Sequence, residues 1–245
     1  MIKFFRKIRF NLMSENKTGK YLKYAIGEIV LVVIGILIAL SINNWNNKKI
    51  QHSTDIEFLG SLKSELVIDS TNLSEKINSY TQRNEGINGT LVSLDTIIHI
   101  NPKQYQEIIK TLKRMEVLTP IGKNLQKNDV ALANGTLTRI DQALNNRYLS
   151  YLELTKSNNE IISKLGKTLQ QLTVLYLMPA IDMQNDTLSI DIQTEFIKIR
   201  NNRLLRNALV HSSDKRNTHL SYMKGQFDNA NALIFSIDSL LNNQQ

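Results

Sequence analysis

The chain of 245 residues has no cysteine, three prolines and ten glycines, and its formal net charge is +8. The lack of cysteine excludes disulfides, thiolate metal sites and cysteine nucleophiles. Residues 1–49 hold nine basic and two acidic residues, so nearly all of the positive charge belongs to this N-terminal segment. A nearly neutral remainder argues against nucleic acid as a partner, whereas a short basic segment beside an apolar run is typical of contact with anionic lipid.

Residues 1–24 form a basic segment that we expect to be amphipathic and to lie on the cytoplasmic surface of a membrane. In a helix, apolar side chains would share one side and basic side chains the other, with Phe4, Phe5, Ile8 and Leu12 opposite Lys3, Arg6 and Lys7. Phe10 interrupts the pattern. The polar residues from Asn11 to Gly19 would form the turn that follows.

Residues 25–42 read AIGEIVLVVIGILIALSI and predict a transmembrane helix. In a helix this stretch is about 27 Å long, close to the hydrocarbon thickness of a bilayer. Tyr24 precedes it and Trp45 follows it, and aromatic rings favour the two membrane interfaces. Seven basic residues and one acidic residue precede the stretch, so the rule that basic loops stay inside places the N-terminus in the cytoplasm.

Besides a re-entrant segment, two other interpretations of this apolar stretch remain open. A cleaved signal peptide also has a basic start and an apolar run, and Ala39-Leu40-Ser41 is an acceptable cleavage triplet. However, the 24 preceding residues are long for such a start. A buried helix of a soluble protein is the other alternative, although such helices are seldom apolar on every side.

Three residues within the apolar stretch attract attention. Glu28 lies about one turn from its start, where it is an interfacial acid close to Lys20 or Lys23, part of a helix–helix contact, or a proton-sensitive site. Gly35 and Ala39 form a small-xxx-small pair that would let two such helices approach closely. The protein itself or another membrane protein is therefore a candidate partner, in addition to the lipid bilayer.

The segment YAIGEIVLVVIGILIALSINNWN, residues 24–46, follows a basic start that ends in SENKTGKYLK. Together these residues resemble a large family of uncharacterised bacterial single-span membrane proteins, a domain of unknown function. The resemblance implies an inner-membrane anchor and a periplasmic helical domain, and it marks Gly27, Glu28 and the NNW segment as family hallmarks. It implies no activity, cofactor or catalytic residue.

Residues 43–245 predict an extracytoplasmic helical domain that begins with a polar collar at residues 43–49. An apolar residue then recurs every seven positions, which predicts a long helix with a bundle or coiled-coil face: Leu59, Leu66, Leu73, Tyr80, Ile87 and Leu94. Asp69 and Lys76 occupy the complementary position, which favours a bundle over a two-stranded coil. We expect the helix to weaken or break at Gly86 and Gly89.

The rest of the chain predicts further helices. Asn101-Pro102 would start one that ends near Met115, and a turn at residues 119–122 would precede a short helix over residues 123–133, closed by Asn134-Gly135. Residues 138–178 predict a long helix that ends at Pro179, and residues 180–191 a loop. The last helical region spans about residues 194–241, with a possible break at residues 211–217. The expected fold class is therefore all-α, with one N-terminal transmembrane helix followed by a long-helix antiparallel bundle of up-and-down type.

No motif predicts catalysis, and we expect no cofactor or metal. The four histidines are scattered and lack the spacing of metal ligands. Asp182, Asp186 and Asp191 share a polar region but lack the spacing of a calcium loop. Arg200, Arg203 and Arg206 recur at helical spacing, and they form either a strip for an acidic partner or a solvated helix face.

Three functions from different classes follow from these features. We expect a non-enzymatic, membrane-anchored interaction or scaffold protein. The alternative is an extracytoplasmic helical domain that senses a small ligand. Because 24 residues are too few for an output domain, such a sensor would require a membrane partner. An enzyme is the third hypothesis, and it would need carboxylates that converge from separate helices.

Overall fold

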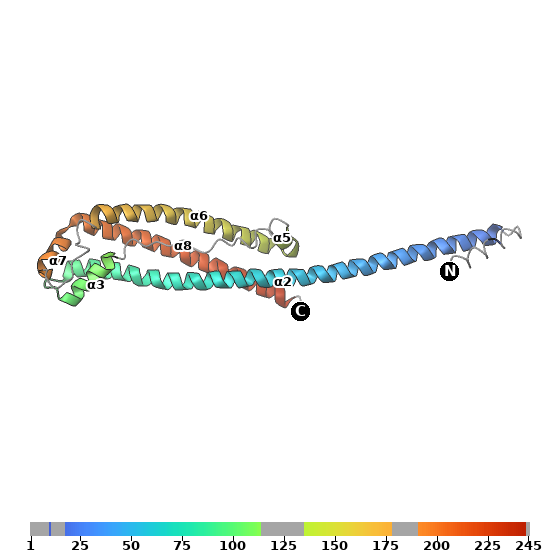
Figure 1. The fold of residues 1–245 in the computed structure, drawn as a ribbon, viewed down its shortest axis with the longest axis horizontal. Helices are drawn as coiled ribbons and strands as arrows, with labels where there is room; N and C mark the ends of the chain where they lie inside the picture. The colour runs from blue at the N-terminus through green and yellow to red at the C-terminus, as the bar shows by residue number, and fades with distance from the viewer. Residues whose placement is uncertain (1–9, 11–17, 114–134, 178–190, 244–245) are drawn as a thin grey trace. The chain divides into compact units, whose positions relative to one another are not determined.

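The computed structural model describes residue 10 and residues 18–113, 135–177 and 191–243, and all regular structure in these residues is helical. The helices are α2 (Thr18–Thr96), α3 (Pro102–Lys113), α5 (Thr136–Ile140), α6 (Gln142–Leu172), the π-helical turn η2 (Thr173–Leu177), α7 (Ile192–Asn201) and α8 (Arg203–Asn242) (Figure 1). The chain divides into two compact units, Met1–Glu57 and Phe58–Gln245, and α2 contributes to both.

The first unit contains the N-terminal half of α2, which is helical throughout the predicted apolar stretch and the polar collar. None of its most apolar window is buried against other protein. The exposed side chains include Ile29, Leu31, Val33, Ile36, Leu40 and Ile42. In the described part of the chain this is the one helix that is long and apolar enough to be a candidate membrane span. This exposure does not fit the alternative that the apolar stretch is a buried core helix of a soluble protein.

The heptad pattern in the C-terminal half of α2 is confirmed as the buried face of that helix. All six predicted positions are at most 2% exposed: Leu59, Leu66, Leu73, Tyr80, Ile87 and Leu94. The predicted break at Gly86 and Gly89 is wrong, because α2 continues to Thr96. A helical glycine costs about 1 kcal/mol relative to alanine, whereas burial of Ile87 and Leu94 contributes about 1.5–3 kcal/mol each. Packing therefore outweighs the local propensity.

Helices α2, α6 and α8 of the second unit pack side by side (Figure 1). One cluster brings together Leu62, Tyr148 and Leu233, one from each helix. A second cluster joins Leu73 and Tyr80 to Ile162 and Met223. Residue numbers rise together along α2 and α6 and fall along α8. Helix α8 is thus antiparallel to both others, whereas α2 and α6 run in the same direction, which differs from the strict alternation of an up-and-down arrangement.

Polar pairs between α2 and α8 advance along α2 in steps of seven, fourteen, four and seven residues, with equal steps back along α8. Lys63 pairs with Asp238 at 2.5 Å and Ser70 donates to Asn231 at 2.9 Å. Asn84 donates to Asn217 at 2.5 Å and Ser213 donates to Asn88 at 2.9 Å, and Arg206 bonds Asp95 at 2.5 Å. Each advance along α2 is matched by an equal retreat along α8. The two helices therefore hold one register from residue 63 to residue 95, as heptad packing requires.

Side-chain caps explain where several helices begin. Asn101 Oδ1 accepts from the Gln104 backbone N–H at 2.9 Å, so Asn101 caps α3 as predicted. Gln104 Oε1 also accepts from the Asn101 N–H at 3.1 Å, which makes the cap reciprocal. Asp141 caps α6, since its Oδ1 accepts from the Leu144 N–H at 2.6 Å. The expected helix over residues 138–178 is therefore interrupted at Asp141.

The predicted break at residues 211–217 is wrong, and the break in the last helical region lies at Asn202 instead. Asn202 ends α7 and caps α8, and α8 is then continuous to Asn242. The polar segment belongs to the interior, since Ser212 and Arg216 are 0% exposed and Ser213 contacts Asn84 and Asn88 of α2. Ser213 thus finds its partners inside the protein, so this polar residue does not require a loop.

Several expectations lie outside the described residues. They are the surface segment of residues 1–24 apart from its last residues and Phe10, the turn at residues 119–122, the helix over residues 123–133, and the end of a helix at Pro179. Gly135, which is described, has a φ of 69°. This left-handed conformation favours glycine and agrees with its predicted place directly before a helix.

Candidate functional site

The predicted anchor residues all lie on the N-terminal half of α2. A Cβ added at Gly27 or Gly35 would meet nothing within 4 Å, and Ala39 is exposed beside the same open surface. Trp45 is 66% exposed, and Lys49 Nζ lies 5.8 Å from its ring centroid. Glu28 is half-buried, and the backbone of Tyr24 is helical. Gly35 and Ala39 therefore give α2 an exposed surface of small side chains in the apolar stretch.

The predicted arginine ridge is divided by the break at Asn202. Arg200, at the end of α7, donates from Nη1 to the Ile97 carbonyl at 3.1 Å. Arg206 forms two hydrogen bonds to the Asp95 carboxylate, and this guanidinium holds the pKa of Asp95 below its ordinary value. Arg203 is exposed. Two of the three cations thus fasten α7 and α8 to the C-terminal end of α2, where orphan carbonyls and the helix dipole favour positive charge.

The histidines and the Asp191 region give no metal-binding arrangement within the described residues. His219 is buried and meets Tyr80 edge to face, with ring centroids 4.8 Å apart. Asp191 caps α7, accepting from the Gln193 N–H at 3.1 Å and from Thr194 Oγ1 at 2.5 Å, and these bonds lower its pKa. Asp182 and Asp186 lie outside the described residues.

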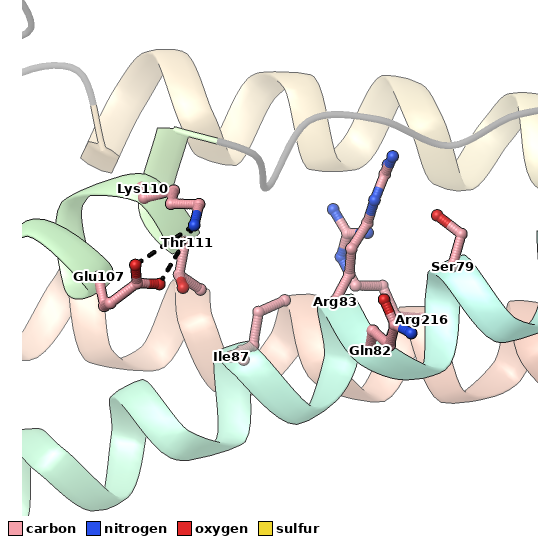
Figure 2. A pocket seen from close by; sticks show the side chains of 9 residues that line it. Ser79, Gln82, Arg83, Ile87, Glu107, Lys110, Thr111 and Arg216 are labelled. Carbon is pink, nitrogen blue, oxygen red and sulfur yellow. Dashed lines mark hydrogen bonds and ion pairs between the residues drawn. The ribbon is translucent and has the colours of Figure 1, made fainter.

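A cavity of about 300 Å³ lies in the second unit and is lined from α2, α3 and α8. Figure 2 shows Arg83 and Arg216 together on one side of it and the Glu107–Lys110 pair of α3 on the other. The remaining lining residues are Ser79, Gln82, Gly86, Ile87 and Thr111. The cavity therefore has polar and apolar surface in similar measure, and Ile87 contributes to the apolar part.

The cavity collects positive charge. Arg83, Lys110 and Arg216 line it together with one acid, Glu107, which gives a formal charge of +2. Lys110 Nζ lies 3.3 Å from Glu107 Oε1, but both side chains are well exposed, so this pair is a weak constraint. Arg216 is 0% exposed, and burial lowers the pKa of its guanidinium. Tyr80 opposes this effect and the nearby charge of Arg83 adds to it.

No sequence pattern predicted this cavity. Its charged residues come from three helices, and their separations in the chain follow no known motif. Arg216 falls in the polar stretch that was interpreted as a break. The pairing of α2 with α8 is the signal that could have revealed the cavity. Asn84 pairs with Asn217 across the two helices, and Arg83 and Arg216 are their neighbours in the sequence.

A second buried polar group joins all three long helices. The Tyr151 hydroxyl donates to Asp69 Oδ2, and Gln226 Nε2 donates to Thr155 Oγ1 and, at 3.2 Å, to the Tyr151 carbonyl. All four residues are buried. A cavity of about 150 Å³ is bordered by Tyr151, Leu154 and Leu233. We interpret the group as a packing element.

These features define an all-helical protein with one candidate membrane-spanning helix. The chain belongs to a family of unknown function, DUF6090, whose model matches residues 28–194. The match begins within the apolar stretch and extends through α3 and α6, well beyond the anchor on which the resemblance was based. No curated protein and no solved structure matches the chain.

Proposed function

We propose that this protein is a non-enzymatic interaction or scaffold protein held in a bacterial inner membrane by residues 25–42. The N-terminus lies in the cytoplasm and residues 43–245 form a periplasmic helical domain, a long-helix bundle. The observation that supports this most is the exposure of the apolar stretch, since the large apolar side chains from Ile26 to Ile42 are all exposed. Burial of apolar area contributes about 25 cal/mol per Å², and hydrocarbon is the environment that provides it.

The scaffold role is supported by the shape of the helices in the second unit. Helix α8 holds forty residues in one element, and its polar pairs with α2 keep a single register. Exposed apolar side chains occur along the outer faces, among them Phe235, Leu175 and Leu204. A long rigid surface with isolated apolar contacts suits docking of another protein better than chemistry on a small molecule.

Membrane anchoring is tested by extraction of native membranes with alkaline carbonate. The wild-type chain should remain in the pellet, and Val33→Arg should move to the supernatant, because a charged residue at the centre of a span costs about 2.5–3.5 kcal/mol on insertion scales. Asn46→Arg, outside the apolar run, is the matched control and should stay in the pellet. Release of the wild-type chain would refute the anchor.

The orientation is tested separately with protease added to intact spheroplasts. Digestion of the C-terminal domain supports a periplasmic position, and protection of that domain in intact cells with digestion after lysis contradicts it. The partner is tested with a photo-crosslinking residue at Phe235, with exposed Asn229 as the control position. One defined adduct at Phe235 supports a scaffold, and recovery of the monomer alone argues against it.

A second candidate function is ligand sensing by the periplasmic domain. The cationic cavity between α2, α3 and α8 favours it, because its volume lies at the lower end of the range for small-molecule sites. A ligand there would contact α2, the helix that continues into the apolar stretch. Protein melting curves measured with and without anionic ligands distinguish this function from a purely structural scaffold.

A further inference from the structure

We propose that the cavity lined by Arg83, Lys110 and Arg216 binds a small oxyanion with two negative charges, of the phosphate or dicarboxylate class. The proposal deepens the ligand-sensing candidate above and rests on it. It does not depend on the membrane anchor, because every lining residue belongs to the unit Phe58–Gln245. Its basis is that three cations from three helices line one half-open cavity.

The electrostatics of the cavity favour an anion. Its lining has a formal charge of +2, and Arg83 and Arg216 are close enough for the charge of Arg83 to disfavour the charged form of Arg216. A dianion between the two helices would offset this repulsion. The Arg83 guanidinium also lies 5.6 Å from the ring centroid of Tyr80, within the range of a cation–π contact.

The three cations would have different roles. Arg83 is half-buried and Lys110 is exposed, so both can donate directly to a bound oxyanion. Arg216 is fully covered at the floor of the cavity and would act through its charge, which is screened little in the interior. Lys110 is held only by an exposed pair with Glu107, which a ligand can replace at low cost.

The neutral lining limits the size and kind of ligand. Ser79, Gln82 and Thr111 offer hydroxyl and amide donors, and Ile87 is the apolar contact. A cavity of about 300 Å³ has room for a phosphate or a short dicarboxylate, and part of a larger ligand would have to lie outside it. Arginine pairs with carboxylate and phosphate through two parallel hydrogen bonds, so Arg83 should contribute most to direct recognition.

The test uses the full-length protein in lipid nanodiscs, titrated with inorganic phosphate and separately with succinate by calorimetry in a chloride buffer. We expect saturable binding of one anion per chain, and the ligand bound more tightly identifies the class. Arg83→Gln should weaken binding about tenfold or more, and Arg83→Lys should weaken it less, because the charge remains without the planar fork. Exposed Arg203→Gln, outside the cavity, is the matched control and should bind as wild type does.

The outcomes separate this proposal from the anchor. Failure of the wild-type protein to bind either anion would overturn the proposal, as would unchanged binding in Arg83→Gln with an unchanged helical spectrum. If Arg83→Gln unfolds, anion binding is measured with Lys110→Gln instead. Lys110 is exposed, so its loss should weaken binding without affecting the fold, and unchanged binding in this variant would overturn the proposal. The carbonate extraction of every variant should be unchanged, so absence of anion binding leaves the membrane proposal intact.

Discussion

The hydroxyl of Tyr151 on α6 donates a hydrogen bond to the carboxylate of Asp69 on α2, and both side chains are almost completely buried. Asp69 stands at the position where the heptad of α2 loses its apolar character. The contact therefore replaces one apolar layer between the two parallel helices with a polar one.

Removing the Tyr151 hydroxyl should destabilise the protein. Tyr151→Phe takes a donor from a buried carboxylate, and we expect a loss of about 1–3 kcal/mol in the free energy of unfolding. Urea denaturation followed by circular dichroism measures it. Tyr222→Phe, at a half-buried tyrosine of α8, should change stability by less than about 0.5 kcal/mol. Equal effects of the two substitutions would show that the Tyr151–Asp69 contact is not stabilising.

The same tyrosine should make stability fall at high pH. Burial, followed by the hydrogen bond to Asp69, raises the pKa of Tyr151 far above the ordinary value of 10.0. The folded state then keeps the proton that the unfolded state releases, so this contribution is complete below pH 10.0 and declines as the pH rises further. Unfolding measured between pH 9 and pH 11 should show a steeper decline for the wild type than for Tyr151→Phe. Parallel curves would contradict the raised pKa.

The ion pair between Asp95 and Arg206 should be visible in the titration of Asp95. Because Arg206 lowers the pKa of this carboxyl, its contribution to stability is present at neutral pH and is lost as the pH falls through the lowered value. Arg206→Gln should return the pKa of Asp95 toward its ordinary value, as measured by carboxyl carbon shifts in NMR. Arg203→Gln should leave it unchanged, and a similar shift in both variants would assign the effect to net charge alone.

Two glycines should respond in opposite directions to alanine. Gly89 is an exposed residue inside continuous α2 with nothing within 4 Å of an added Cβ, so Gly89→Ala should stabilise the protein by up to about 1 kcal/mol. Gly135 has a φ of 69°, and Gly135→Ala should destabilise it by about 1–2 kcal/mol. Thermal unfolding measures both. No gain from Gly89→Ala would place a helix break near that residue after all.

The sequence predicted the helical class and the buried face of α2 because a seven-residue apolar repeat is a local signal. It did not predict the polar interior. Asp69 only interrupts the apolar pattern in the sequence, because its hydrogen-bond partner Tyr151 lies 82 residues away and no local pattern links the two. Residues 211–217 looked like a loop for the same reason, because Asn84 and Asn88 satisfy Ser213 only once α2 and α8 are paired. The cavity around Arg83 and Arg216 likewise depends on register, which composition does not encode.

The matched polar pairs of α2 and α8 also restrict how this unit can move. If either helix shifted lengthwise by two turns, the apolar stripes would still face each other. Lys63 would then leave Asp238, Asp95 would leave Arg206, and the Asn84–Asn217 contact would be lost at the same time. Piston-like sliding between these helices is thereby opposed at both ends and in the middle, and rotation or bending remains the cheaper deformation.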